Sequence, residues 1–244
     1  MYAAKASVVA LTLLLSSPTL AATLVPGDSV FLFGTTAVAD PDLTGVELND
    51  NILPFRIDPN PATPFTDIGG VVQNRVTRSD NTGNLIFAPR IRSTFNTEVS
   101  RFVITSFSLT GYSGFATDVE YRDDGAGQEG IEFGRRSASG DQLEFGFPLG
   151  LRIDSVTPGV QRESLFPAIK TDATNFALTG SMTIFGHLRR FDITGEPLPV
   201  MDEDRASVTI TGLAVPVTTP VPLPASALLL LAGLAGLGAM RRRH

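Results

Sequence analysis

Hydrophobic and polar residues alternate along several segments of the chain, which is the pattern of a strand with one buried face. The longest such segment covers residues 142–153, and shorter ones cover residues 85–91, 103–109 and 206–210. Pro148 lies inside the longest segment and predicts an edge strand or a β-bulge there. The apolar positions of that segment are Leu143, Phe145, Phe147, Leu149, Leu151 and Ile153.

Turn-forming residues separate these segments. Glycine, together with Asp, Asn, Ser or Pro, gathers at residues 79–83, 123–125, 139–141 and 157–159. Between the two ends of the chain, no apolar stripe has the period and length of a helix. Short strands joined by such turns predict an all-β fold, with a single β-sandwich or jelly-roll-like domain.

The N-terminus has the build of a secretory signal peptide at residues 1–22. Lys5 supplies the positive charge, an apolar run follows at residues 6–15, and small residues end the segment. Ala21 and Ala22 are the expected cleavage positions, which implies the Sec translocon and signal peptidase as partners. An uncleaved anchor is the alternative, although the apolar run is shorter than the roughly 20 residues of a membrane span.

The C-terminus has a different, three-part build. After a body at residues 23–214 and a proline-rich linker at 215–220, a short motif occupies residues 221–226 and an apolar segment residues 225–240. A helix over that segment would be about 24 Å long, a marginal membrane span. The motif consists of Val221, Pro222, Leu223, Pro224 and Ala225, followed by Ser226.

A basic tail at residues 241–244 closes the chain. Arg241, Arg242 and Arg243 form a stop signal that the positive-inside rule places in the cytoplasm. The body then lies on the far side of the membrane, where the signal peptide also directs it. The two ends therefore predict the same topology.

This order of motif, apolar helix and basic tail resembles the PEP-CTERM sorting signal of Gram-negative bacteria, in its VPLPA variant. The resemblance covers residues 221–244, and Leu223 stands where the namesake motif has glutamate. In that family an exosortase, a membrane-embedded cysteine protease, recognises the tail and cuts near the motif. The resemblance implies a transient membrane anchor with the body in the periplasm, followed by delivery to the cell surface or extracellular matrix.

Three other interpretations of the tail stay open. A permanent single-span anchor has the same hydropathy. A sortase signal would need Thr-Gly after Leu223-Pro224-x, and the chain has Ser226 and Ala227 there. A GPI signal would need a polar spacer before the apolar segment.

The body resembles, more loosely, a recurrent β domain of PEP-CTERM proteins that has no known activity. The similar segments lie at residues 69–87, at residues 136–145 from Arg136-Ser137 through Gly140, and at residues 170–176. This resemblance implies a fold and no activity.

Charge and composition narrow the partners. Without Lys5 and the three C-terminal arginines, 15 basic residues face 25 acidic ones, a net charge near −10. Such a body is a poor partner for nucleic acid or polyanionic glycans. The chain has no cysteine, no tryptophan and sixteen phenylalanines, so disulfides are excluded, and the phenylalanines are expected in the core rather than in a sugar-stacking surface.

Few residues in the body suggest catalysis. Ser113 lies in Gly-Tyr-Ser-Gly, which lacks the full nucleophile-elbow pattern, and His187 is the body's only histidine. Glu120, Glu132 and Glu144 could meet as the paired carboxylates of a hydrolase, but their spacing equally suits exposed strand positions.

Calcium is the one cofactor that the sequence suggests. Acidic loop segments at residues 40–42, 49–51, 123–125 and 202–204 offer hard oxygen ligands, although plain turns need the same residue types. No other metal site is expected.

The sequence therefore predicts an exported, exosortase-processed protein without enzymatic activity. A structural or adhesive role at the cell surface or in a biofilm matrix, with exopolysaccharide or surface proteins as partners, is what the PEP-CTERM resemblance implies. The alternatives are a secreted hydrolase that uses paired carboxylates and a calcium-dependent adhesion module.

Overall fold

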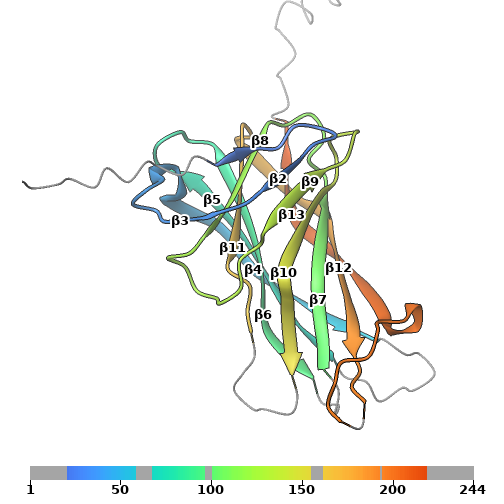
Figure 1. The fold of residues 1–244 in the computed structure, drawn as a ribbon. Helices are drawn as coiled ribbons and strands as arrows, with labels where there is room; N and C mark the ends of the chain where they lie inside the picture. The colour runs from blue at the N-terminus through green and yellow to red at the C-terminus, as the bar shows by residue number, and fades with distance from the viewer. Residues whose placement is uncertain (1–20, 59–67, 97–100, 155–161, 193, 219–244) are drawn as a thin grey trace, which may run out of the picture.

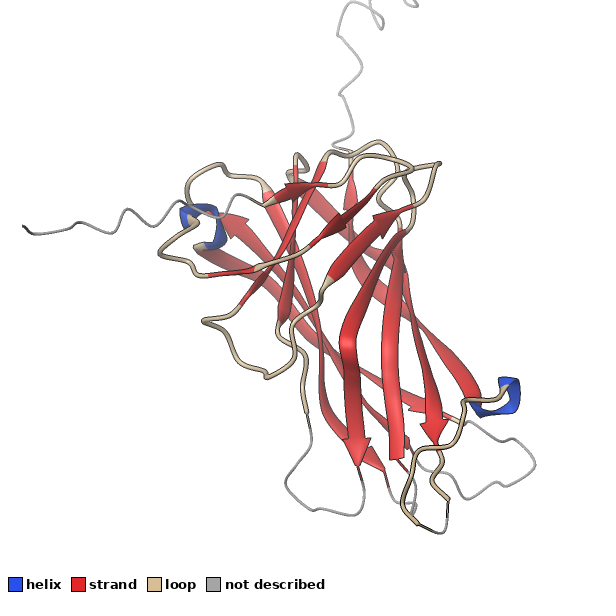
Figure 2. Ribbon diagram, in the orientation of Figure 1, coloured by secondary structure: helices blue, strands red, loops and turns tan. Residues whose placement is uncertain are grey.

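The computed structural model describes residues 21–58, 68–96, 101–154, 162–192 and 194–218. Strands make up most of this part of the chain, as Figure 2 shows. The helical structure in it consists of two 3-10 turns, η1 (Pro41–Leu43) and η2 (Asp202–Asp204). The predicted all-β class is confirmed.

The strands form two sheets (Figure 1), antiparallel except where β3 (Gly34–Thr35) runs parallel beside β8. Sheet A otherwise runs in the order β1 (Ala22–Thr23), β8 (Thr117–Arg122), β11 (Phe166–Thr171), β6 (Leu85–Asn96), β5 (Ile68–Ser79), β4 (Gly45–Ile57). Sheet B runs in the order β13 (Arg205–Val217), β12 (Asn175–Arg189), β7 (Arg101–Thr110), β10 (Leu143–Asp154), β9 (Phe133–Arg136), β2 (Ser29–Phe31).

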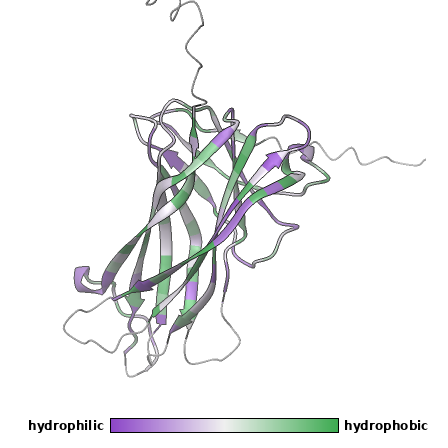
Figure 3. Cartoon of the chain, turned by 180° about the vertical axis from the view of Figure 1, so that it is seen from behind, coloured by the Kyte–Doolittle hydropathy of each residue, from purple (hydrophilic) through white to green (hydrophobic). Residues whose placement is uncertain are grey.

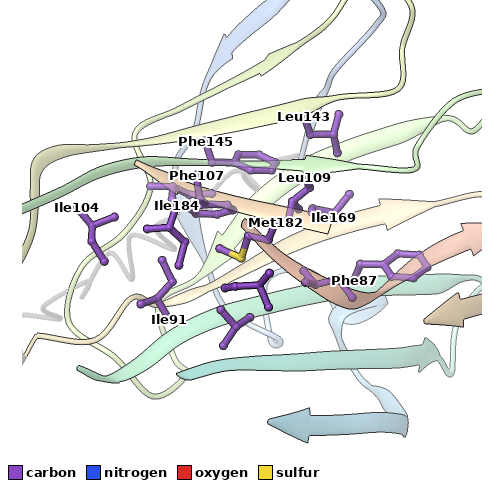
Figure 4. Packing of buried hydrophobic residues seen from close by; sticks show 14 of the residues in the cluster. Phe87, Ile91, Ile104, Phe107, Leu109, Leu143, Phe145, Ile169, Met182 and Ile184 are labelled. Atoms are coloured by element: carbon purple, nitrogen blue, oxygen red, sulfur yellow. The ribbon is translucent and has the colours of Figure 1, made fainter. Parts of the chain in front are cut away.

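The core lies between the two sheets. Alternate side chains of each long strand point inward, so the strands carry mixed hydrophobic and hydrophilic positions (Figure 3). In Figure 4, Phe87, Ile91 and Ile169 of sheet A face a larger set from sheet B. The sheet B residues labelled there are Ile104, Phe107, Leu109, Leu143, Phe145, Met182 and Ile184.

Asn74 is a polar exception on the inner face of β5. Its side-chain Oδ1 accepts a hydrogen bond of 3.1 Å from the backbone N–H of Ala214, and its Nδ2 donates to the carbonyl of Gly212 at 3.4 Å. Both partners lie in β13 of the other sheet. Buried polar groups are stable only when paired, so Asn74 ties the two sheets together at this point.

The segment around Pro148 is both a bulge and an edge. The register between β10 and β7 shifts between Gly146 and Leu151, and the pairing with β9 ends at Gly146. Gly150 has φ +70°, a conformation that other residues rarely adopt. The prediction made from Pro148 is therefore confirmed. The physical reason is that proline has no N–H group and cannot donate a hydrogen bond to a neighbouring strand.

The last strand extends beyond residue 214. β13 ends at Val217, and Val215, Pro216 and Val217 pair with β12. The first three residues of the predicted 215–220 linker thus belong to the sheet. At the other end, β1 begins at Ala22, one of the two predicted cleavage positions.

Candidate functional site

The predicted sorting elements fall mostly outside the described residues. The motif residues Val221 to Ala225 and the arginines 241–243 lie in the segment 219–244, and the signal peptide up to residue 20 is likewise outside. Within the described residues, no helix is long and apolar enough to cross a membrane. The C-terminal helix therefore stays a prediction.

The three candidate carboxylates are divided between the sheets. Glu120 is in β8 of sheet A, and its neighbour Val119 points into the core. Glu144 is in β10 of sheet B, where Phe145 points into the core, and Glu132 is exposed just before β9. Because side chains alternate along a strand, Glu120 and Glu144 face outward on opposite sides of the molecule. The structure does not bring these two together.

Ser113 and His187 are also separated. His187 pairs with Val103 near the start of β7, whereas Ser113 follows the far end of that strand. At about 3.3 Å per residue, ten residues of strand place them roughly 30 Å apart. Burial lowers the pKa of His187, and the nearby charge of Arg205 lowers it further.

The acidic loops have structural partners. Asp40 caps η1 through the N–H of Asp42, Asp50 accepts hydrogen bonds from Arg75, and Asp124 accepts them from Arg122. Asp204 forms an ion pair with Arg190 and accepts the N–H of Met201. In the part of the chain that the structure describes, no group of three or more acidic or histidine side chains is placed to hold a metal ion.

The most developed site lies on the outer face of sheet A. Arg75 of β5 pairs with Ala88 of β6, and Arg90 of β6 pairs with Gln73 of β5, so alternate positions of both strands turn the same face outward. Arg92 of β6 follows on that face. Arg122 of β8 lies opposite Phe166 of the neighbouring strand β11, and its side chain reaches the same face as the other three arginines.

Four arginines thus line one hollow with a volume of about 380 Å³, here called the arginine pocket. Its described lining contains no acidic side chain. The rest of the wall is mostly apolar or small and consists of Leu43, Ile86, Ala88, Gly125, Ala126, Phe166, Pro167 and Ala168, with Gln73 and Thr77.

Phe166 orients two of the arginines. The guanidinium carbon of Arg75 lies 4.8 Å from the ring centroid of Phe166, and that of Arg90 lies 5.1 Å from it. Stacking of this kind fixes the plane of a guanidinium and leaves its N–H edges available. The side chain of Arg90 is only 5% exposed and donates from Nε to the carbonyl of Ser164 at 3.0 Å.

The acids that balance these arginines stand outside the pocket. Asp50 and Glu47 pair with Arg75 at 3.0 and 3.1 Å, Glu163 forms an ion pair with Arg90, and Asp124 pairs with Arg122 at 2.9 Å. Arg92 differs from them, because its described hydrogen bond goes to the neutral Oε1 of Gln73 at 3.2 Å, and its buried Nε has no partner among the described residues.

A buried ionic cluster lies beside the pocket on the same face. The loop that carries η1 folds over sheet A, where Leu43 packs against Ile86 and Ala168. Beneath it, Lys170 forms ion pairs with Asp40 and, at 3.1 Å, with Oε1 of Glu120. Lys170 thereby joins the loop to the sheet.

The side chain of Glu120 is 3% exposed, and neither of its carboxyl oxygens has a well-aligned hydrogen bond to a described residue. Burial raises the pKa of Glu120 to about 7, and Asp40 adds to this, although Lys170 opposes it. Burial alone would raise the pKa of Asp40, but the hydrogen bonds with Lys170, Glu120 and the N–H of Asp42, together with the charge of Lys170, outweigh it and lower the pKa of Asp40. Near neutral pH, Glu120 is therefore close to its midpoint of ionisation, and Asp40 is ionised.

Chemically, the arginine pocket can bind an anion, because its guanidinium groups are donors only. Comparison of the chain with known protein families, with curated proteins and with solved structures finds no match.

The arginine pocket was not predicted from the sequence. A net charge near −10 argues against a basic surface for the body as a whole, but it does not describe the charge of any one face. The signal that was present is Arg90-Ile91-Arg92, in which two arginines flank a core residue within one strand.

Proposed function

We propose that this chain is an exported protein that is cut at its C-terminal motif and acts at the cell surface or in the extracellular matrix. The observation that carries the proposal is the tail itself. Val221 to Ala225, the apolar residues 225–240 and Arg241 to Arg243 follow one another in the order of a PEP-CTERM signal. The N-terminal segment 1–22, with its small residues at Ala21 and Ala22, supports export by the Sec route.

The end of the folded body is consistent with cleavage at the motif. The last strand, β13, ends at Val217, four residues before Val221. A cut at or after the motif would remove none of the residues in the two sheets. Processing would therefore release the body with both sheets complete.

A non-enzymatic role, structural or adhesive, is the proposed activity of the body. The described strands cross repeatedly between the sheets, at β6 to β7, β7 to β8, β8 to β9, β10 to β11 and β11 to β12. Such crossings support a sandwich of jelly-roll-like form, which is a rigid carrier for surface loops. The separation of Glu120 from Glu144 removes one pairing on which the hydrolase alternative depended.

The stop signal offers a direct test of this function. Replacing Arg241, Arg242 and Arg243 with glutamate is expected to abolish cleavage. The substitution removes the positive charge that holds the tail on the cytoplasmic side of the membrane. The readout is the size of the protein in membrane and extracellular fractions of its native cells. Only the uncut form should accumulate.

Replacing the same three residues with lysine is the matched control. Lysine keeps the positive charge, so cleavage should continue near the normal level. Normal cleavage of the glutamate variant would contradict the proposed role of the tail.

A further inference from the structure

We infer that the arginine pocket binds a small organic carboxylate, an acid group carried on a compact, partly apolar body about the size of one sugar or amino-acid residue. The inference concerns the outer face of sheet A alone. It depends neither on export nor on processing of the tail, and either proposal can fail without the other.

Some N–H groups of the pocket arginines have no acceptor among the described residues. Asp50, Glu163 and Asp124 engage Nε or Nη2 of Arg75, Arg90 and Arg122, and no described residue accepts from Nη1 of these three side chains. Arginine has donors only, so a ligand that completes these contacts must bring acceptor oxygens. Charged oxygens make the stronger bonds.

Arg92 has no ion pair among the described residues, unlike the other three arginines. Its described hydrogen bond goes to the neutral Gln73, and its buried Nε has no partner in the part of the chain that the structure describes. Burial lowers the pKa of Arg90, and although Glu163 counteracts this, the charges of Arg92 and Arg75 lower it further. An anion in the pocket would relieve this repulsion among the arginines.

The site is organised before any ligand arrives. Phe166 holds the guanidinium groups of Arg75 and Arg90 by stacking, and the Ser164 carbonyl anchors Arg90. Long side chains that are already fixed lose less conformational entropy when they bind. The arginines are therefore a prepared site, unlike solvated surface side chains.

The size and wall of the pocket select an organic acid over a bare anion. A volume of about 380 Å³ lies within the range of small-molecule sites. One oxyanion would fill a small part of it and leave the apolar wall at Ile86, Ala88 and Ala168 uncovered. A carboxylate on a compact body fits both parts of the pocket. Its two planar oxygens match the donor fork of the guanidinium groups, and its body covers the apolar wall.

The surroundings favour a single acidic unit over a polyanion. The body carries a net charge near −10, so a chain of many acidic groups would meet repulsion outside the pocket. One carboxylate per ligand avoids this.

The test is calorimetric titration of the purified full-length protein at low ionic strength with matched probes. Glucuronate is compared with glucose, and N-acetylleucine with N-acetylleucinamide, so that each pair consists of one monocarboxylate and one neutral compound of similar size. Inorganic phosphate tests an anion that has no organic body. At least one acid should bind saturably, and at least tenfold more tightly than its neutral counterpart and than phosphate. The acid that binds more tightly shows whether the natural ligand is more similar to a sugar acid or to an amino acid.

Two variants locate the site. Arg92→Gln should weaken binding of that acid at least tenfold, whereas Arg205→Gln, which makes the same charge change at an exposed position on sheet B, should change it less than twofold. Ala88→Leu fills the apolar wall without removing a charge and should also abolish binding. This variant tests the site if Arg92→Gln folds poorly. The inference is overturned if neither acid binds, if neutral probes or phosphate bind as well, or if Arg205→Gln weakens binding as much as the pocket variants.

Discussion

Replacing Arg136 with alanine is expected to lower the free energy of unfolding by at least about 3 kcal/mol. Arg136 lies in β9 and is 4% exposed, and each of its five N–H groups has a described acceptor. The acceptors are the carbonyls of Gly140, Leu24, Tyr112 and Phe115 and the hydroxyl of Thr117. They belong to segments of both sheets, so this side chain joins the sheets at one end of the molecule.

The loss follows from what the substitution leaves behind. Alanine removes all five donors at once, and buried acceptors without partners cost about 1–3 kcal/mol each where water cannot reach them. It also leaves a cavity. Arg136→Lys should be destabilising as well, because an ammonium group cannot reproduce the planar fork of donors.

Arg135 provides the matched control one residue earlier. Its side chain is exposed on the same strand, so Arg135→Ala should change the free energy of unfolding by less than about 0.5 kcal/mol. Urea denaturation followed by circular dichroism measures both variants. Equal losses for the two variants would contradict the role given to Arg136.

A second large effect is expected from Glu120→Gln, and it should depend on pH. The folded protein raises the pKa of Glu120 to about 7 from an ordinary value of 4.5. The folded state therefore holds this proton more tightly than the unfolded state does. The resulting stabilisation is complete below about pH 4.5 and is lost as the pH rises through about 7.

Glutamine resembles the protonated carboxylic acid and does not titrate. The variant should match the native protein near pH 4 and be more stable by up to about 3 kcal/mol near pH 8, because the pKa difference is 2.5 units at about 1.4 kcal/mol each. Thermal or urea unfolding across this pH range measures the difference. Lys170 keeps its partner Asp40 in the variant.

Glu132→Gln is the control, because Glu132 is exposed. It should leave the pH dependence unchanged. If Glu120→Gln and the native protein lose stability in parallel between pH 5 and pH 8, the account of the buried cluster is wrong.

The strand pattern was predictable because it depends on neighbours in sequence. Residues 142–153 form most of β10, with Leu143, Phe145, Leu151 and Ile153 in the core, and Pro148 marks the bulge. Period-two alternation records which face of a strand is buried, and turn residues record where it ends. Both signals are local.

The sites were not predictable in the same way, because they depend on register between strands. Arg75, Arg90 and Arg122 meet only through the pairing of β5 with β6, of β6 with β11 and of β11 with β8. Glu120 was one of three candidate acids, but its burial under the loop around η1 brings it to Asp40, eighty residues away in sequence. No sequence periodicity records such contacts.

The expectation that the phenylalanines fill the core was correct for some of them and wrong for others. Phe87, Phe107 and Phe145 are buried, whereas Phe31 and Phe33 are 72% and 70% exposed. The last two lie in and just after β2, at the free edge of sheet B. Apolar character shows that a residue can be buried, but the position of its strand in the sheet decides whether it is.

The most direct test of the central claim is the intact mass of the protein recovered from its native cells, fraction by fraction. The account predicts a chain that begins near Ala22 or Thr23 and ends within residues 221–226, outside the inner membrane. A mass that runs through His244, found in the membrane fraction, would show a permanent anchor and contradict the proposed processing.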